Sequence, residues 1–354
     1  MNNIALVGGG TAGHIMPNIA LADELKKRFD KVLYIGTPHS MEEDICKSKN
    51  LPFFPTESAK FHRKKIWKNF ILPITLAKGI KQAKRILREQ VVSVVFSKGR
   101  FAAVPTVIAA HRLGIPVVCH ESDRSMGLAN RITALFAKRV YTAFPGTYRK
   151  AEIMPTPIRK EIFEGKPLDI FPNHDKKTLL FMGGSLGAEA INDALSKSYA
   201  SLADKYNVIH ISGRGGIPLR TNSYYALPYA ENIADLFATA DLIVSRGGAS
   251  TLGELTALGK RVLVIPLPKG ESRGDQEENA AYYLSLGLVH VLPQSTLSEE
   301  TLITAIDDII RMDAHAPTYD KKTVAELAED LLLIALYAQR ERAKRTTIIP
   351  KSKR

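Results

Sequence analysis

Short apolar runs alternate with amphipathic stretches along the first part of the chain. A short uninterrupted apolar run is typical of a strand buried on both faces of a sheet. Apolar residues three or four positions apart indicate a helix. Strands separated by helices indicate right-handed βαβ units and therefore a parallel sheet. The predicted strands are residues 4–7, 32–35, 91–96, 116–119 and 140–142, and the predicted helices are 17–28, 74–89, 104–113 and 127–137.

A change of composition separates this part from the next. Residues 153–173 contain four prolines and a glycine, which is typical of a hinge or linker. The same alternation then resumes, so the two halves of the chain share one architecture. This duplication predicts an α/β fold of two Rossmann-like domains facing each other across a cleft. The later strands are predicted at 178–182, 208–212, 242–245 and 261–265, with helices after Gly187, Ser250 and Asp275 and a last helix at 323–344.

Two glycine-rich loops follow predicted strands, one in each half. The first is Gly8-Gly9-Gly10-Thr11-Ala12-Gly13, and the second is Gly183-Gly184-Ser185-Leu186-Gly187-Ala188. A strand that ends in glycines and opens a helix directs backbone N–H groups and the positive end of the helix at one point. The sequence therefore predicts an anion site in each domain.

The first loop matches the dinucleotide fingerprint G-x-G-x-x-G. That fingerprint expects an acidic residue near the end of the second strand, where it binds the ribose. Here the second strand ends Tyr34-Ile35-Gly36-Thr37, and the first acid after it is Glu42. The second loop does not match the fingerprint, so an NAD or FAD enzyme is not favoured.

Positive charge is concentrated in two stretches of this 354-residue chain, residues 60–88 and the C-terminal tail 340–354, and the net charge is +13. Residues 60–88 contain ten Lys or Arg residues and no acid, with apolar residues among them. Three interpretations compete: a helix with a solvated basic face, an anionic membrane surface, and nucleic acid. The second is favoured for the cluster Lys64, Lys65, Ile66, Trp67, Lys68, Phe70 and Ile71, whereas Leu76, Ile80, Ala83 and Leu87 have the spacing of a core-facing stripe. No nucleic-acid motif is present, so a nucleic-acid partner is not expected.

Other classes of protein are disfavoured by what the sequence lacks. There are only two cysteines, too few for a disulfide framework or a Cys-type zinc site. No apolar run approaches the roughly 20 residues of a membrane helix, and no signal-peptide pattern opens the chain. The expectation is a protein that works in the reducing cytoplasm.

The motifs, taken in order, resemble those of the MurG family of GT-B glycosyltransferases. They are Gly8 to His14, Ser97-Lys98-Gly99-Arg100-Phe101, His120-Glu121-Ser122-Asp123, Pro155-Thr156-Pro157-Ile158-Arg159, Gly183 to Ala188, Ser245 to Glu254, and Asp275 to Ala280. The resemblance implies transfer of N-acetylglucosamine from UDP-GlcNAc to lipid I, which forms lipid II and UDP in peptidoglycan synthesis. It also implies a peripheral enzyme on the cytoplasmic face of the cell membrane, in contact with anionic inner-leaflet lipids.

The chain departs from the family pattern at three places. Arg100 follows Gly99 where a second glycine is common, and a side chain restricts the backbone there. Ser122-Asp123 follows His120-Glu121 in place of Gln-Asn. Asp275 stands where other members carry glutamine, which leaves Gln276 and Asn279 as the expected sugar contacts.

A donor site is predicted in the second half of the chain. Glu254 has the chemistry for two hydrogen bonds to a ribose diol, although an ordinary acid at a helix start would look the same. Arg159 is a candidate cation for the leaving diphosphate, or else a salt-bridge residue. The complete set of expected donor contacts is Arg159, Ser185, Ala230, Ser250, Thr251, Glu254, Gln276 and Asn279, with Ala230 placed there by the resemblance alone.

An acceptor site is predicted in the first half. The loop Gly10, Thr11, Ala12 and Gly13 suits the acceptor's diphosphate, and the resemblance adds Asp123. His14 is the nominated general base, with Glu121 as its rival or as the group that orients it. The resemblance implies inversion at the anomeric carbon, and hence a direct displacement with one base.

The remaining expectations concern metals, domain limits and alternatives. No Asp-x-Asp pair lies near the donor segments, so no cofactor or metal is required, although an added divalent ion could stimulate turnover. An acceptor- and membrane-binding domain is expected at 1–158 and a UDP-GlcNAc-binding domain at 159–335, with a helix at about 336–354 packing back on the first. The alternatives are another UDP-sugar GT-B enzyme (a transferase or an epimerase) and a membrane-docked nucleotide-sugar sensor.

Overall fold

The chain divides into two compact units. The computed structural model describes residues 2–58, 72–183, 188–213, 216–318 and 322–348. By its contacts, the first unit comprises residues 1–122, 126–157 and 321–354, and the second comprises 123–125 and 158–320. The division falls between Pro157 and Ile158, inside the proline-containing stretch. The chain returns to the first unit at residue 321, earlier than the expected position near 336.

The first unit is built on one parallel sheet. Its seven strands lie in the order β3-β2-β1-β4-β5-β6-β7, and every neighbouring pair is parallel. The strands are β1 Asn3–Val7, β2 Lys31–Gly36, β3 Phe53–Pro55, β4 Val92–Ser97, β5 Val117–Glu121, β6 Arg139–Thr142 and β7 Glu152–Ile153. The helices are α1 Ala12–Lys26, α2 Met41–Ser48, α3 Leu72–Glu89, α4 Val104–Arg112, α5 Leu128–Ala134 and α11 Lys322–Ile348, with a short 3-10 helix η2 at Phe101–Ala103.

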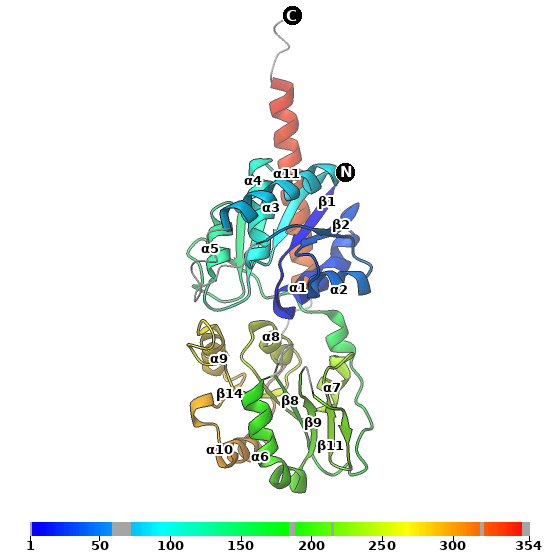
Figure 1. Ribbon diagram of the computed structural model, residues 1–354, viewed down its shortest axis with the longest axis vertical. Helices are drawn as coiled ribbons and strands as arrows, with labels where there is room; N and C mark the ends of the chain where they lie inside the picture. The colour runs from blue at the N-terminus through cyan, green and yellow to red at the C-terminus, as the bar shows by residue number, and fades with distance from the viewer. Residues whose placement is uncertain (1, 59–71, 184–187, 214–215, 319–321, 349–354) are drawn as a thin grey trace, which may run out of the picture. The chain divides into compact units, whose positions relative to one another are not determined.

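Both faces of this sheet are covered, which explains its uninterrupted apolar strands. Successive residues of a strand point to opposite faces. Ile4 and Leu6 of β1 therefore join one core with α1, α2 and α11, whereas Ala5 and Val7 join a second core with α3, α4 and α5. Figure 1 shows these helices around the sheet. Ile80, Ala83 and Leu87 are buried, as their spacing predicted.

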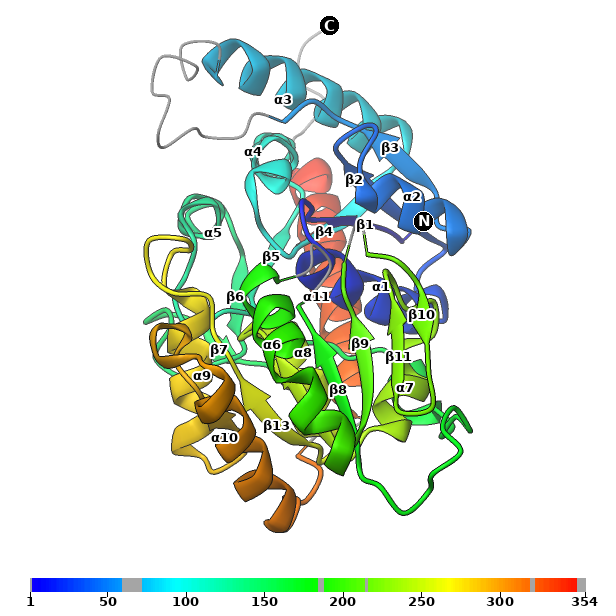
Figure 2. The same ribbon diagram turned by 60° about the horizontal axis from the view of Figure 1, so that its bottom comes forward.

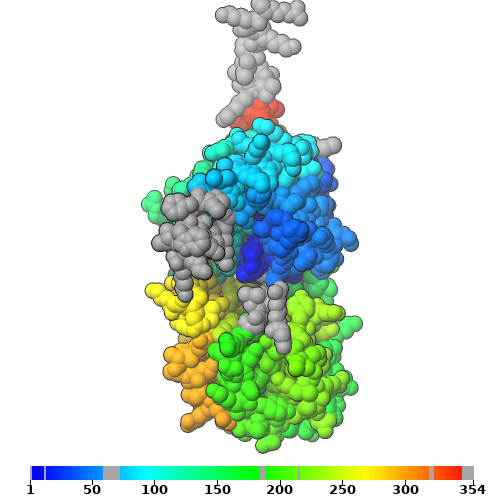
Figure 3. Space-filling model, in the orientation of Figure 1, coloured from blue at the N-terminus to red at the C-terminus, as the bar shows by residue number. Residues whose placement is uncertain are grey.

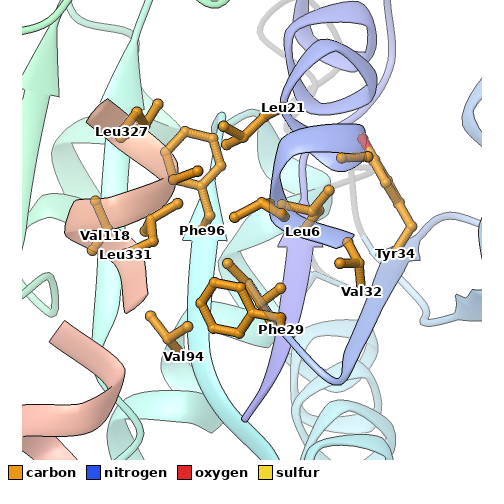
Figure 4. Packing of buried hydrophobic residues seen from close by; sticks show 14 of the residues in the cluster. Leu6, Leu21, Phe29, Val32, Tyr34, Val94, Phe96, Val118, Leu327 and Leu331 are labelled. Carbon is orange, nitrogen blue, oxygen red and sulfur yellow. The ribbon is translucent and has the colours of Figure 1, made fainter. Parts of the chain in front are cut away.

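The long C-terminal helix α11 is part of the first core. Leu327 and Leu331 are fully buried and lie beside Phe96 and Val118 of β4 and β5 (Figure 4). Asp330 forms an ion pair with Arg139 at 2.5 Å. Because these residues precede 336, the expectation that only the last part of this helix packs on the first unit was wrong: its first turns make the buried contacts.

The second unit repeats the architecture. Its strands lie in the order β10-β11-β9-β8-β12-β13-β14, and all pairs are parallel except β10 with β11 at one edge. The strands are β8 Thr178–Met182, β9 Asn207–Ile211, β10 Leu219–Arg220, β11 Tyr224–Leu227, β12 Leu242–Ser245, β13 Arg261–Val264 and β14 His290–Val291. The helices are α6 Glu189–Lys205, α7 Ile233–Thr239, α8 Ala249–Ala257, α9 Asp275–Ser285 and α10 Glu299–Arg311, with 3-10 helices η3 Lys160–Glu164 and η4 Gln294–Thr296.

Helices cover both faces of the second sheet as well. Leu179 and Phe181 of β8 pack with α6 and α10, whereas Leu180 and Met182 pack with α7, α8 and α9. Figure 2 shows α6 and α10 on one side of β8 and β13, and Figure 3 shows α10 beside α6 on the surface of this unit. The prediction of an α/β fold with two Rossmann-like units is confirmed.

Each sheet has one point at which the strand order reverses direction. In the first unit this point lies between β1 and β4, and in the second it lies between β8 and β12. Open α/β sheets bind ligands outside the carboxyl ends of the strands at such a point. The strands that precede the two glycine-rich loops, β1 and β8, both lie at these points.

Candidate active site

A buried carboxylate supports the first glycine loop. Glu42 is 1% exposed, and its oxygens accept hydrogen bonds from the N–H of Gly10 at 3.4 Å and of Thr37 at 3.3 Å. A Cβ on Gly9 would lie 2.4 Å from Glu42 Oε1, which explains the glycine. The N–H of Gly10 is thus directed at Glu42, and the expectation that it serves a bound diphosphate needs correction.

The start of α1 remains available to an anion. Thr11 is its N-cap residue and makes no side-chain capping bond. The first N–H groups of a helix have no partner within the helix, so they attract a negative group when no side chain caps them. The anion site predicted at Thr11, Ala12 and Gly13 stays a prediction, and the uncapped start of the helix is consistent with it.

His14 lies in the first turn of α1 and is held in one orientation. Its Nδ1 is 3.0 Å from the backbone oxygen of Lys98, and its side chain is mostly buried. A carbonyl oxygen can only accept, so Nδ1 carries the proton and the neutral ring keeps its lone pair on Nε2. That is the form a general base requires.

Lys98 extends a buried polar network from this point. Its Nζ donates to His120 Nδ1 at 2.7 Å and to Ser122 Oγ at 2.5 Å. His120 Nε2 donates to the backbone oxygen of Met154 at 3.0 Å. Burial lowers the pKa of His120 well below its usual value, and Lys98 lowers it further. His120 therefore stays neutral and holds Lys98 at the end of β4.

Glu121 is engaged in the architecture of the first unit. It is 2% exposed, and its Oε2 accepts from Asn130 Nδ2 at 2.8 Å and from the N–H of Gly127 at 3.1 Å. These bonds join the end of β5 to the start of α5. Of the two nominated bases, the geometry favours His14.

In the second unit, Glu254 and Arg159 form an ion pair. Arg159 Nη2 lies 3.0 Å from Glu254 Oε1, and the two side chains are 21% and 14% exposed. Burial raises the pKa of Glu254, although the charge and hydrogen bond of Arg159 act in the opposite direction. The structure thus joins two residues predicted for the donor, and it also bears out the salt-bridge interpretation of Arg159.

Glu254 lies on α8, the helix that follows β12 at the second switch point. Gly248 is its N-cap residue and makes no side-chain capping bond. Ser250 and Thr251, in its first turn, are partly exposed. The uncapped start of α8 and the carboxylate of Glu254 are thus presented by one helix, as a nucleotide site requires.

Two predicted sugar contacts form hydrogen bonds with backbone groups of the second unit itself. Gln276 Oε1 accepts from the N–H of Gly247 at 3.2 Å and of Leu267 at 3.0 Å. Asn279 is fully buried, and its Nδ2 donates to the backbone oxygen of Gly247 at 3.1 Å. The expectation that Asn279 reads sugar hydroxyls is not supported by this arrangement, because its amide holds the loop before α8.

Asp123 also differs from its expected place. Its contacts assign it to the second unit, where it pairs with Arg273 at 3.0 Å and accepts from Asn279 at 3.2 Å. The expectation that it contacts the acceptor's diphosphate is therefore not supported. Ala230 lies after β11 and packs partly buried against the core.

The comparisons with known proteins agree with this geometry. The model of the glycosyltransferase family 28 N-terminal domain matches residues 4–142, and that of the C-terminal domain matches 178–332. The crystal structure of Acinetobacter baumannii MurG is 25% identical, with a TM-score of 0.69, and the match covers 96% of this chain and 95% of that one. The calicheamicin glycosyltransferase CalG4, at 14% identity and a TM-score of 0.64 over 99% of this chain and 100% of that one, shares the fold.

Sequence relatives decide the family. A Clostridium botulinum (strain Hall) protein named UDP-N-acetylglucosamine--N-acetylmuramyl-(pentapeptide) pyrophosphoryl-undecaprenol N-acetylglucosamine transferase is 41% identical over 320 residues, which cover 87% of this chain and 90% of that protein. The chain belongs to the MurG family of glycosyltransferases. A Clostridium novyi protein of the same name is 38% identical over 322 residues, with the same coverage of both chains.

Some residues predicted for this MurG-family chain lie outside the described ones. They are Ser185 of the second loop and the membrane cluster Lys64, Lys65, Ile66, Trp67, Lys68, Phe70 and Ile71. Among the described residues, no group of three or more His, Cys, Asp or Glu side chains is arranged to hold a metal ion. No helix in that part of the chain has the length and apolar character of a membrane span.

Sequence reasoning missed Glu42 and Lys98 as site residues. The only sign of Glu42 was its position as the first acid after the second strand. A lysine among apolar strand residues, as in Phe96-Ser97-Lys98, could have indicated a buried cation.

Proposed function

We propose that this chain transfers N-acetylglucosamine from UDP-N-acetylglucosamine to lipid I, forming lipid II and UDP in peptidoglycan synthesis. The observation that carries this proposal is the 41% identity to a transferase of that name over 90% of its length. The reaction forms a bond between the acceptor hydroxyl oxygen and the anomeric carbon of the sugar. It breaks the bond from that carbon to the β-phosphate oxygen of the donor, so that the leaving group is UDP.

The second unit holds the donor. Glu254 accepts hydrogen bonds from the two ribose hydroxyls, and the N-termini of α6 and α8 face the phosphates. Arg159 supplies a cation to the leaving diphosphate. This assignment is supported by the uncapped start of α8 and by the ion pair that places Arg159 beside Glu254. Fixed N–H groups and cations stabilise the charge that develops on a leaving phosphate.

The first unit holds the acceptor and removes its proton. The N-terminus of α1 binds the acceptor's diphosphate, and Nε2 of His14 takes the proton of the attacking hydroxyl. The bond from His14 Nδ1 to Lys98 supports this role, because it leaves Nε2 unprotonated. Glu121 and Lys98 position the surrounding loops.

A coupled assay of UDP release tests the function. The full chain is incubated with UDP-N-acetylglucosamine and a lipid I analogue, and the glycosylated product is identified by mass spectrometry. UDP release that depends on the acceptor supports the proposal. Epimerised donor, or donor binding without turnover, contradicts it.

The same proposal includes binding at an anionic membrane surface, since the acceptor carries a polyprenyl chain. The described part of α3 supports it: Lys78, Lys81 and Arg85 are exposed, and Ile74 is 71% exposed beside them. Exposed cations contribute about 1 kcal/mol each near anionic lipids, and apolar side chains enter the interface.

Trp67→Glu is expected to weaken binding to anionic vesicles by about tenfold or more, because it removes an apolar group and adds a repelled charge. Sedimentation with vesicles of phosphatidylglycerol and phosphatidylcholine measures the change. Ile217→Glu, at an 82% exposed site of the second unit, is the matched control and should bind like wild type. Binding that is insensitive to salt, or equal in both variants, contradicts this surface.

A further inference from the structure

Arg100 has a backbone conformation that side chains rarely adopt. Its φ is 67° and its ψ is 167°, a region occupied almost only by glycine. Arg100 therefore occupies a strained backbone conformation that an arginine side chain does not favour.

The strain lies at the switch point of the first sheet. β4 pairs with β1 so that Ser97 lies opposite Val7, and the N–H of Lys98 donates to the backbone oxygen of Val7 at 2.9 Å. The backbone oxygen of the same Lys98 holds His14. Arg100 is thus two residues beyond the group that orients the proposed base.

Its surroundings fix this conformation. Gly99 has a φ of +84°, and a Cβ there would lie 1.9 Å from Asn130 Oδ1, so the turn passes directly against a buried side chain. Asn130 is in turn held by Glu121 at 2.8 Å. After the turn, the N–H of Ala103 donates to the backbone oxygen of Arg100 at 3.1 Å and begins η2.

The arginine side chain points to no polar partner within the described part of the molecule. Arg100 is exposed, and its guanidinium has no hydrogen bond or ion pair with any described residue. Residues held in such a sparsely populated backbone region cluster at functional sites. A guanidinium offers two parallel N–H groups, which match an oxygen pair of a phosphate.

We propose that Arg100 binds the diphosphate of the acceptor. The inference rests on the proposed function and adds to it a residue that contributes to acceptor specificity. Glu42 directs the N–H of Gly10 inward, which leaves the first loop with fewer donors for an anion. Arg100, at the neighbouring strand end, supplies a cation beside the start of α1.

Three substitutions separate the charge from the strain. Arg100→Ala removes the cation and keeps a side chain in the strained region, Arg100→Gly removes both, and Arg100→Lys keeps the cation. We expect the KM for a lipid I analogue to rise about tenfold or more in the Ala and Gly variants and less in the Lys variant. The KM for UDP-N-acetylglucosamine should stay at its wild-type value in all three.

Thermal unfolding gives an independent readout. Arg100→Gly should raise the Tm by a few degrees above wild type while it lowers acceptor affinity, and Arg100→Ala should not raise it. Val91→Gly is the matched control: Val91 has a φ of 47°, is 55% exposed, and precedes β4 at its opposite end. It should raise the Tm with both KM values unchanged.

Inorganic pyrophosphate identifies the group that Arg100 binds. At saturating UDP-N-acetylglucosamine, pyrophosphate should compete with the acceptor, and Arg100→Ala should weaken its Ki by a factor similar to that of the acceptor KM. An unchanged pyrophosphate Ki with a raised acceptor KM would assign Arg100 to a carboxylate of the acceptor and overturn the diphosphate assignment. A wild-type acceptor KM in Arg100→Ala would overturn the inference altogether, whereas an inactive wild-type protein would contradict the proposed function.

Discussion

Replacement of His14 by alanine is expected to lower kcat by about two to four orders of magnitude and to leave the KM for UDP-N-acetylglucosamine close to wild type. General-base catalysis by a positioned histidine contributes a factor of this size. The bond from Nδ1 to the backbone oxygen of Lys98 leaves the lone pair of the neutral ring on Nε2, so loss of the ring removes the proton acceptor. The donor contacts lie on the second unit and should not change.

His14→Asn separates the chemical role from the structural one. Its side-chain amide can still donate toward the oxygen of Lys98, so the local hydrogen bond is retained while the base is lost. Steady-state kinetics with varied donor and varied acceptor measure both variants. His174→Ala, at an exposed histidine of the second unit, is the control and should be fully active. A kcat within a few-fold of wild type in His14→Asn would remove His14 from the chemical step.

Glu254→Gln is expected to weaken UDP binding by about 10- to 100-fold. A carboxylate that accepts hydrogen bonds from two ribose hydroxyls is a charged acceptor, and charge-assisted bonds contribute about 1.5–3 kcal/mol each. The amide keeps the shape of the side chain but loses the charge and one acceptor oxygen. It also weakens the interaction that holds Arg159 at 3.0 Å.

The pH dependence of UDP affinity gives a second test of the same residue. Burial raises the pKa of Glu254, and the ionised form is the one that accepts both hydroxyl protons. UDP affinity in wild type should therefore fall as the pH falls through this raised pKa. Glutamine does not titrate, so Glu254→Gln should lose this part of the pH dependence.

Isothermal titration with UDP between pH 5 and 8 measures both effects, because carboxyl groups with a raised pKa titrate in this range. Glu278→Gln is the control, because Glu278 is exposed on α9 in the same unit. UDP affinity in Glu254→Gln within twofold of wild type would show that Glu254 is only a structural partner of Arg159.

The large elements could be predicted because their signals are local. The strand at 178–182 was predicted at the bounds it has in the structure, and that at 4–7 begins one residue earlier, at Asn3. Such runs are recognisable because both faces of a parallel sheet are covered. The sequence did not predict α2 and β3, since an eight-residue helix rich in acids and a three-residue strand carry too few periods of any pattern.

The candidate site was only partly predictable. Motif order singled out His14, Glu254 and Arg159, and the structure shows His14 held by Lys98 and Glu254 paired with Arg159. Motif order could not distinguish Asn279, which is fully buried, from a side chain that faces a ligand. Two polar residues one helical turn apart give the same sequence pattern whether they bind a substrate or donate to a backbone carbonyl.

By itself, the amino-acid sequence determined the α/β class and the two glycine loops, because hydrophobic period and glycine spacing are features of a few neighbouring residues. The order of its motifs carried the resemblance to a glycosyltransferase family. Only the tertiary structure decided which groups those loops present. Glu42 comes to lie beneath Gly10, and α11 completes the core of the first unit from the far end of the chain. The strain at Arg100 arises from a turn packed against Asn130. These depend on contacts between residues distant in the chain, which no local pattern records.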